Sequence, residues 1–516
     1  MAKYYNKIIE QKPSTSGFVK TEEEKVLFDL YKLNSSYDEM IDKNKQPRTH
    51  CYPMYDRLLK MSPEEMEKRH AFAHGDFLRQ GITFTVYNDN KGTERTMPFD
   101  FVPKVIPQKE WHQIEKGLIQ RFEALNMFLD DVYHDQKILK DKVIPRDLIV
   151  NCPHFFHQVA HIDVPARQHI FMAGIDLIRD EKGEYRVLED NLRNPSGLSY
   201  VFQNRYVMRK VYPELFYDYS VQSLENQFSK IHASMSYLAP HQNPDPTIVL
   251  LTPGVFNSAY YDHSFIAQRS GIELVEGRDL VVQNRSVYMK TSRGLKKVDV
   301  IYRRIDDEFL DPLEFREDSL LGVPGLVDAY RAGNVSILNG IGNGVADDKA
   351  VYHYVPDMIR YYLGEEPLVK NVDTYLCRDE EQRAYVLEHL DELVVKATNA
   401  SGGYGMLIGP HATGEEIEKF REQIQINPSE YIAQPTINLS SLPAYKGDRF
   451  AACHVDLRVF IFGGETPTVF PGGLTRVALK EGSLVVNSSQ GGGAKDTWVL
   501  QDEEVDHQEE GEQSHA

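Results

Sequence analysis

The sequence predicts a mixed α/β (α+β) fold with more than one sheet, and three segments carry this prediction. Residues 246–345 alternate apolar strand patterns with helical patterns, which is typical of a small parallel sheet. Residues 171–191 instead predict an antiparallel hairpin, and residues 391–409 predict two strands joined by a glycine-rich loop. A chain of 516 residues is long enough to hold these sheets in several domains.

The composition excludes several classes of protein. Hydrophobic residues make up 41% of the chain and charged residues 26%, as in ordinary globular proteins. No apolar run is as long as a membrane helix, and residues 1–17 lack the apolar core of a secretory signal. The net charge of −19 argues against a general affinity for nucleic acid. The four cysteines are scattered, as in reduced cytosolic proteins. We therefore expect a cytoplasmic protein without nucleic-acid or membrane partners; a homo-oligomer stays open.

The N-terminal part predicts a mixed extension followed by a long helix. Ser62 is a helix N-cap, with Pro63 at the first helical position and Glu65 three residues after the serine. Residues 81–87 alternate like a strand, and residues 108–139 show sustained helical periodicity.

The hairpin at 171–191 brings together oxygen-bearing side chains that could hold a metal ion, although such a set alone is more typical of a solvated surface turn. Asp176 lies on its first strand, and Glu189 and Asn191 end the second strand on one face, because strand side chains alternate. Two carboxylates and one amide oxygen suit Mg²⁺ that is also held by substrate phosphates.

The segment at 391–409 predicts a phosphate-binding loop. Lys396 lies on an otherwise apolar strand, where a phosphate partner would offset the cost of burying its charge. The loop after it contains Ser401, Gly402, Gly403, Tyr404 and Gly405. Its glycines permit backbone N–H groups to approach phosphate oxygens. The Walker spacing is absent, so this is no P-loop.

Further polar residues follow this loop. The strand at 431–437 contains Gln434, Pro435 and Thr436, and the strand at 454–462 carries Asp456 and Arg458 on one face. Arg476 follows, and then Asn487, a run of three glycines and Lys495 beside Asp496.

Together these segments resemble the bacterial circularly permuted ATP-grasp family of type 2, whose members are often described as glutathionylspermidine-synthase-like. The motifs VLEDNLRNPSGLSY, VDVIYRRIDDEFLDP, GVADDKAVYHYVP, HVDLRVF and NSSQGGGAKDTWVL carry the resemblance, which covers roughly residues 95–500. In the usual order of the ATP-grasp fold the acidic hairpin comes last, whereas here it comes first. A separate cysteine amidase domain, as in the bifunctional glutathionylspermidine enzymes, is absent from the sequence.

The resemblance implies five segments. They are an N-terminal extension (1–95), the displaced half of the ATP-grasp fold with the Mg²⁺ hairpin (96–225), a parallel α/β domain (226–345), the other half with the phosphate loop (346–500) and an acidic tail (501–516). The tail carries seven acidic residues and no Lys or Arg, which predicts a solvated, disordered terminus or a docking site for a basic partner.

The resemblance also implies a reaction and residue roles. A carboxylate would attack the γ-phosphate of ATP to give an acyl-phosphate, and an amine would then displace phosphate. Mg²⁺ would be held by Asp176, Glu189 and Asn191. The phosphates and the nucleotide would be held by Lys349, Lys396, the loop Ser401–Gly405, residues Gln434–Thr436, Asn487 and Lys495. Arg458 and Arg476 would stabilise the transferring phosphoryl group.

Four residues are expected near the substrates, and three activities are left open. Arg193 and Ser196 follow the acidic strand and could line the substrate entrance. Arg303 and Arg304 are adjacent on a strand, so one is expected to be structural and the other to face substrate.

For His154, His157 and His161 we expect a structural role or a substrate contact rather than a metal site. A kinase on the same fold and an inert nucleotide-binding partner remain alternatives to the ligase.

Overall fold

The computed structural model describes residues 27–88, 91–399, 405–486 and 492–501. The N-terminal part contains η2 (Leu27–Leu30), η3 (Thr49–Cys51), α2 (Tyr52–Lys60), α3 (Pro63–Arg79) and the hairpin of β1 (Thr83–Asn88) and β2 (Lys91–Thr96). The predicted cap is confirmed, because Ser62 accepts a hydrogen bond from the backbone N–H of Glu65 (3.2 Å). β3 (Lys104–Ile106) then pairs in parallel with β23 (Thr497–Val499), so the strand that precedes the long helix at 108–133 lies beside the last strand of the described chain.

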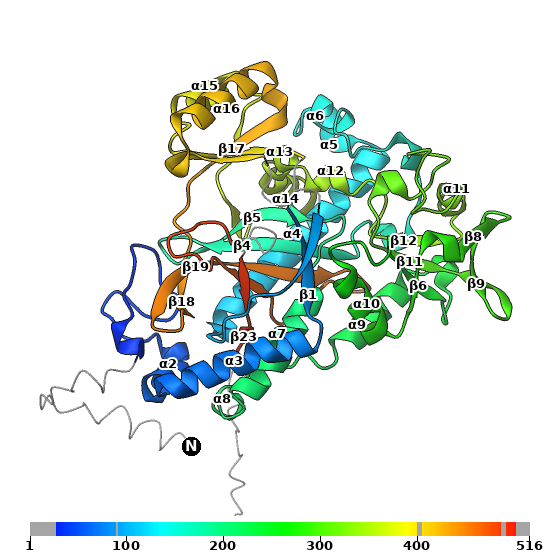
Figure 1. Cartoon of the computed structure of the whole chain (residues 1–516). Coiled ribbons are helices and arrows are strands. Elements are labelled where there is room, and N and C mark those ends of the chain that lie inside the picture. The colour runs from blue at the N-terminus through cyan, green and yellow to red at the C-terminus, as the bar shows by residue number, and fades with distance from the viewer. Residues whose placement is uncertain (1–26, 89–90, 400–404, 487–491, 502–516) are drawn as a thin grey trace, which may run out of the picture.

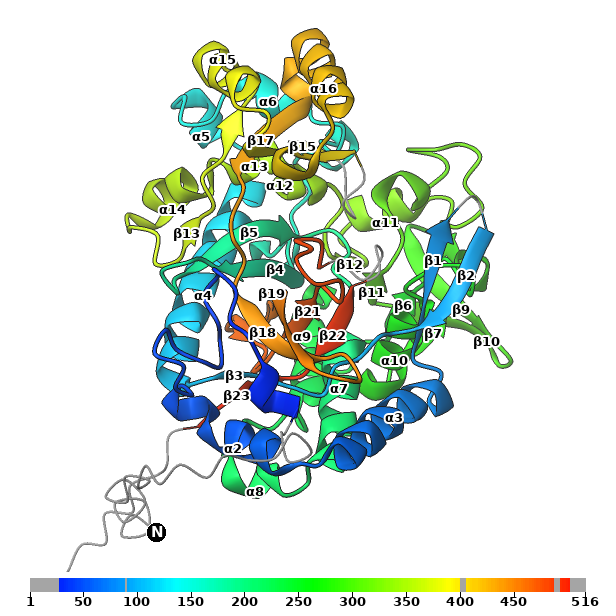
Figure 2. The ribbon, with the colours of Figure 1, turned by 60° about the vertical axis from the view of Figure 1, so that its left-hand side comes forward.

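The largest sheet joins segments that are far apart in the sequence. Its order is β13-β5-β4-β19-β21-β22, and β18 and β20 also pair with β19. These strands are β4 (Met172–Arg179), β5 (Tyr185–Asn191), β13 (Lys370–Asn371), β18 (Ser441–Tyr445), β19 (Phe450–Phe462), β20 (Thr468–Val469), β21 (Leu474–Val477) and β22 (Gly493–Lys495). Figure 2 shows the cyan β4 and β5 beside the orange and red β19, β21 and β22. The hairpin of β4 and β5, from the first half of the chain, therefore completes a sheet whose other strands lie within residues 370–495.

A smaller antiparallel sheet stands apart from this body. Its order is β14-β17-β15-β16, with β14 (Tyr375–Leu376), β15 (Leu393–Ala397), β16 (Met406–Ile408) and β17 (Tyr431–Pro435). Helices α15 (Glu380–Glu388) and α16 (Gly414–Ile426) accompany it at the top of Figure 1. It has a small core of its own, which includes Val395, Leu407 and Ala433.

The parallel sheet predicted for residues 246–345 is confirmed. Its order is β12-β11-β6-β7 and every neighbouring pair is parallel. The strands are β6 (Ile248–Leu251), β7 (Glu273–Val275), β11 (Val300–Arg303) and β12 (Ser336–Leu338). Between them lie α10 (Tyr260–Ser270), which Gly271 caps, α11 (Leu326–Arg331) and a separate sheet of β8 (Leu280–Gln283), β9 (Ser286–Thr291) and β10 (Gly294–Val298).

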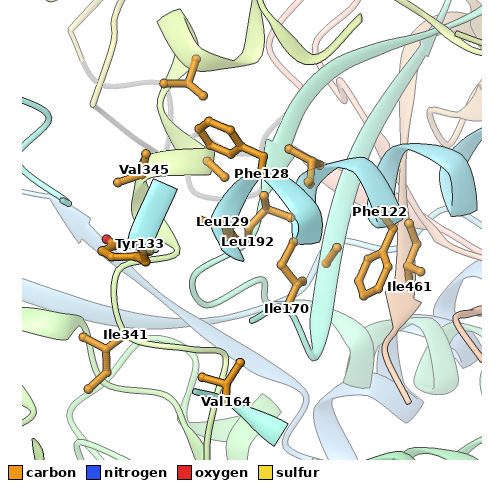
Figure 3. Close-up of a cluster of buried hydrophobic side chains, with 14 of the residues drawn as sticks. Phe122, Phe128, Leu129, Tyr133, Val164, Ile170, Leu192, Ile341, Val345 and Ile461 are labelled. Carbon is orange, nitrogen blue, oxygen red and sulfur yellow. The ribbon is translucent and has the colours of Figure 1, made fainter. Parts of the chain in front are cut away.

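The helix α4 (Gln108–Tyr133) carries much of the core, as its periodicity predicts. Phe122, Phe128, Leu129 and Tyr133 of α4 are buried and belong to one cluster with Ile461 of β19 (Figure 3). The remaining helices of this part are α5 (Lys137–Lys140), α6 (Arg146–Val150), α7 (Leu198–Val211), α8 (Leu215–Asp218) and α9 (Gln227–Tyr237).

The sequence of residues 346–364 predicts one helix that starts near Lys349; a helix does start there, but the segment is divided. It forms three short helices, α12 (Gly344–Asp347), α13 (Lys349–Tyr352) and α14 (Val355–Leu363). Asp348 is extended (φ −63°, ψ 128°), and its side chain caps α13 by accepting from the N–H groups of Ala350 and Val351. The first break therefore follows from an aspartate that acts as a cap. Within the described ranges, no helix combines the length and the apolar character needed to cross a membrane.

Candidate active site

The acidic hairpin places its polar side chains at one edge of the main sheet. β4 and β5 are antiparallel, with Asp176 opposite Glu189 and Gly174 opposite Asn191, and the register shifts just after Asp176. Asp180 shapes the turn by accepting the N–H groups of Lys182 and Glu184 (both 3.0 Å). Asp190, between Glu189 and Asn191, forms a bidentate ion pair with Arg121 of α4 (2.6 and 2.7 Å). This pair holds β5 against α4 while its neighbours line a cavity.

The pairing of β19 with β4 on one side and with β21 on the other brings two arginines onto Asp176. Arg458 lies opposite Asp176 and donates from Nε (2.6 Å) and Nη2 (2.8 Å). Arg476 donates from Nη2 to the same carboxylate (2.7 Å), and its Nε donates to Asp456 (2.8 Å). Burial raises the pKa of Asp176, but the two guanidinium groups outweigh it and hold that pKa well below its ordinary value. Arg458 thus pairs with Asp176 rather than with Asp456.

A cavity of about 410 Å³ opens beside this cluster. It collects many of the residues that the sequence predicts: Glu189, Asn191, Arg193, Ser196, Lys349, Arg458 and Arg476. The first four come from the displaced half of the chain and the other three from its last third. Polar and cationic side chains from residues as far apart in the sequence as Glu189 and Arg476 therefore line one cavity.

Lys396 lies on β15 of the smaller sheet. Its Nζ donates to Oε1 of Gln434 on β17 (2.7 Å), and Nε2 of Gln434 donates to Thr374 (3.0 Å). The pKa of Lys396 is lowered to about 8, chiefly by burial; the charge of Lys349 contributes to this shift, while Glu189 and Asp176 oppose it. Lys396 is thus close enough to sense Glu189 and Lys349, which both line the cavity.

The lowered pKa of Lys396 leads to a prediction on pH. If this lysine binds a nucleotide phosphate, its cationic form is required, and that form is lost as pH rises through about 8. We expect the Kd for ATP to rise about tenfold between pH 7 and pH 9, over a range in which the phosphates stay ionised. Lys396→Arg should remove this dependence, because guanidinium stays charged. Calorimetric titrations across that range measure it, and an equal loss of affinity in Lys396→Arg would contradict it.

Several predicted residues lie elsewhere. Lys495 is fully buried, and its Nζ contacts Asp100, the carbonyl oxygen of Val102 (3.1 Å) and that of Pro443 (2.8 Å). Its neighbour Asp496 pairs with Arg205 (2.8 Å). Neither residue lines the cavity, so the prediction that Lys495 holds the nucleotide is replaced by a structural role.

Arg303 has the structural role that was expected of one of the adjacent arginines Arg303 and Arg304. It is fully buried and donates to the carbonyl oxygens of Asn339 and Ile305 and to Asp307 (2.9 Å). Arg304 contacts the hydroxyl of Tyr302 (3.2 Å) and the carbonyl oxygen of Asn194 (3.3 Å), behind the cavity wall. Both arginines support the site from behind and neither lines the cavity.

The residues predicted to form a nucleotide loop are only partly described. Ser401, Gly402, Gly403, Tyr404 and Asn487 lie outside the described residues. Gly405 is exposed, with a positive φ of 67°. Pro435 ends β17, and Thr436 donates to the carbonyl oxygen of Glu392 (2.8 Å) rather than toward the cavity.

The cavity also contains residues that the motifs did not single out: Asn194, Ser258, Asp306, Asp347, Asp348, Thr398 and Asn399. His154, for which a substrate contact was one expectation, lines it as well. Ser258, Asp306 and Asp347 follow β6, β11 and β12, so the predicted strand ends of the parallel sheet were the signal that could have identified them.

Comparison with known proteins agrees with this arrangement. Residues 103–478 match the family model described as circularly permuted ATP-grasp type 2. An uncharacterized protein from Synechocystis sp. is 51% identical over 472 residues, which cover 91% of this chain and 98% of that protein. A Frankia alni protein, provisionally named glutamate–cysteine ligase 2-3, is 39% identical over 468 residues, which cover 90% of this chain but 54% of that protein.

Among solved structures, a glutathione synthetase-like effector of Globodera pallida, in its apo form, superposes with a TM-score of 0.54 at 11% identity. The alignment covers 86% of this chain and 98% of the effector, and at this identity it concerns the fold alone. The strand pairing, the cavity and the match over residues 103–478 lead to one conclusion. The chain belongs to the circularly permuted ATP-grasp type 2 family.

Proposed function

We propose that the protein is an ATP-dependent carboxylate–amine ligase that works through an acyl-phosphate. One observation carries the proposal: Glu189 and Asn191 from the displaced hairpin line the same cavity as Lys349, Arg458 and Arg476. Oxygen ligands for a cation and cationic groups for phosphates are the two components that phosphoryl transfer from ATP requires. The name of the Frankia relative, a glutamate–cysteine ligase, agrees with a ligase, and the resemblance to the ATP-grasp family supports ATP as substrate.

The donor set fits Mg²⁺. Glu189 offers a carboxylate, and Nδ2 of Asn191 donates to the carbonyl oxygen of Gly174 (3.1 Å), which leaves Oδ1 of Asn191 to face a cation. Mg²⁺ prefers such oxygens and keeps several waters, so two protein ligands are enough. When bound, the ion would neutralise charge that develops on the transferred phosphoryl group. Asp176 is predicted as a third ligand, but its carboxylate is fully buried against Arg458 and Arg476.

The side chains would act mainly by binding and orienting charged groups. Lys349 and Lys396 would hold phosphates, and Arg458 and Arg476 would stabilise the transferring phosphoryl group. The substrate carboxylate oxygen would bond to the γ-phosphorus as the bond to ADP breaks. The amine nitrogen would then bond to the acyl carbon, and phosphate would leave with the electron pair of the broken C–O bond. Guanidinium groups suit both steps, since their charge is permanent and their geometry planar.

The proposed nucleotide site is tested by calorimetric titration of ATP with and without Mg²⁺. We expect Mg²⁺-dependent binding in the wild-type chain and a Kd about tenfold higher in Glu189→Gln, since one ligand of the ion loses its charge. Glu184→Gln is the matched control, because Glu184 is an exposed residue at the turn of the same hairpin. Binding that is indifferent to Glu189, or equally weakened in Glu184→Gln, would contradict the nucleotide site.

The reaction type needs its own readout. Release of ADP that requires both a carboxylic acid and an amine, with formation of an amide, is the result expected for a ligase. A stable phosphorylated product formed without an amine would instead identify a kinase. ATP binding without turnover on any acid would favour an inert nucleotide-binding protein.

A further inference from the structure

The cavity has a second end, at the edge of the parallel sheet. β6, β11 and β12 are adjacent and parallel, and the segments that follow their carboxyl ends supply Ser258, Asp306 and Asp347 to the cavity wall. Ligands of open parallel sheets bind outside the carboxyl ends of the strands. This end therefore has the position of a binding site that is distinct from the nucleotide end, where β5, β19 and β21 supply Glu189, Arg458 and Arg476.

The charges of the two ends differ. The nucleotide end carries the cations Lys349, Arg458 and Arg476. At the other end Asp306 is exposed and, among the described residues, forms no salt bridge; Asn194 Nδ2 donates a hydrogen bond to it (2.9 Å), and its charge also acts on Arg193 and His154. The neighbouring carboxylates are already engaged, because Asp347 pairs with Arg193 (2.7 Å) and Asp348 caps α13. Asp306 is thus the carboxylate at this end that can pair with an incoming cation.

Two further groups suit a nitrogen ligand. Oδ1 of Asn194 is buried and accepts no hydrogen bond from the described residues, although buried acceptors are normally satisfied. His154 also lines the cavity, in close contact with Gly344 and near Arg193: a Cβ added to Gly344 would lie 2.7 Å from the His154 ring and 2.8 Å from Cδ of Arg193. Burial, and then the charge of Arg193, lower the pKa of His154 and outweigh the opposite effect of Asp307 and Asp306, so its imidazole is neutral and able to accept a proton at physiological pH.

We propose that this end of the cavity binds the amine substrate as a protonated primary amine, with Asp306 as its counter-charge and Asn194 Oδ1 as a hydrogen-bond acceptor. The proposal rests on the ligase function proposed above and specifies its second substrate. The ammonium gives one proton to His154, and the free amine attacks the acyl-phosphate. The N–C bond forms, the C–O bond to phosphate breaks, and the second proton lost by nitrogen ends on the released phosphate. His154 then returns its proton to solvent.

The experiment separates activation of the acid from binding of the amine. Hydroxylamine is a small and largely uncharged nucleophile near neutral pH, and it traps acyl-phosphates as hydroxamates without a site for an ammonium group. The full chain is first incubated with Mg²⁺, ATP, hydroxylamine and a panel of the common amino acids, glutathione and small dicarboxylates. With an acid that forms hydroxamate, amide formation is then measured with ammonia, amino acids and polyamines.

For Asp306→Asn we expect the KM for the amine to rise at least tenfold, while hydroxamate formation stays within twofold of the wild type. Glu308→Gln, at an exposed acid two residues further along the chain, should leave both rates unchanged. His154→Gln should lower kcat for the amine and leave its KM within twofold.

Three results would overturn the inference. They are an unchanged amine KM in Asp306→Asn, an equal loss of the hydroxylamine reaction, or the same change in Glu308→Gln. No hydroxamate from any acid, although ATP binds, would overturn the ligase function and this inference with it. Hydroxamate formation without a cationic amine as substrate would overturn the inference alone.

Discussion

Replacement of Asp176 by alanine is expected to lower the free energy of unfolding by about 3–5 kcal/mol and ATP turnover by at least about a hundredfold. Asp176 is the shared partner of Arg458 and Arg476, and its carboxylate is fully buried. Removal of one member of a buried ion-pair network leaves charges that are neither hydrated nor paired. Arg476 would keep Asp456, but Arg458 would lose both of its charged contacts to the sheet.

Denaturant unfolding and ATP turnover measure the two effects separately. Asp176→Asn keeps one acceptor oxygen and should recover part of the stability. Its Mg²⁺ dependence also distinguishes two roles of this residue. If Asp176 supports the arginines, the Mg²⁺ concentration for half-maximal ATP binding should stay close to the wild-type value. A shift as large as that of Glu189→Gln would instead identify Asp176 as a metal ligand, and an unchanged unfolding midpoint in the alanine variant would contradict the structural role.

Local patterns predicted those elements whose formation depends on neighbouring residues. The cap at Ser62, the β4–β5 hairpin and the parallel strands β6, β11 and β12 each depend on side-chain alternation, a turn or a capping residue close in sequence. The helix expected from Lys349 does start there, because the side chain of Asp348 caps it, but it is divided after Tyr352 into α13 and α14.

The site was predicted as far as it resembles a family motif. Glu189, Arg458 and Lys349 stand in such motifs, and the structure brings them to one cavity. Asp306 and Asn194 stand there too, but nothing local marks Asp306 as a carboxylate that forms no salt bridge within the described part of the chain. That property depends on Arg193 pairing with Asp347 instead, a contact between residues 154 positions apart. Charge balance in a cavity is a tertiary property, and the sequence supplies only its components.

Lys495 is a residue for which the local sequence predicts a nucleotide contact that its tertiary surroundings do not support. Its replacement is the second change for which we expect a large effect. Lys495 follows three glycines and precedes an aspartate, a context that is typical of a phosphate loop. In the structure its Nζ is enclosed by Asp100 and by two backbone carbonyl oxygens, and none of its side chain is exposed. Burial lowers the pKa of Lys495, and the carboxylate of Asp100 opposes that shift.

Lys495→Met is therefore expected to cost about 3–5 kcal/mol of unfolding free energy, because Asp100 would remain as a buried charge without its cation. Asp100 also accepts the N–H groups of Val102 (3.0 Å) and Tyr445 (2.7 Å), so it cannot leave this position. Adding Asp100→Asn should recover part of the loss, since the charge disappears while one acceptor remains. Lys480→Met, at an exposed lysine, is the control and should change stability little.

The folded Lys495→Met protein should bind ATP with a Kd within twofold of the wild-type value. A stable variant with a much weaker Kd for ATP would contradict this account, because it would place Lys495 in the nucleotide site despite the enclosure of its ammonium group.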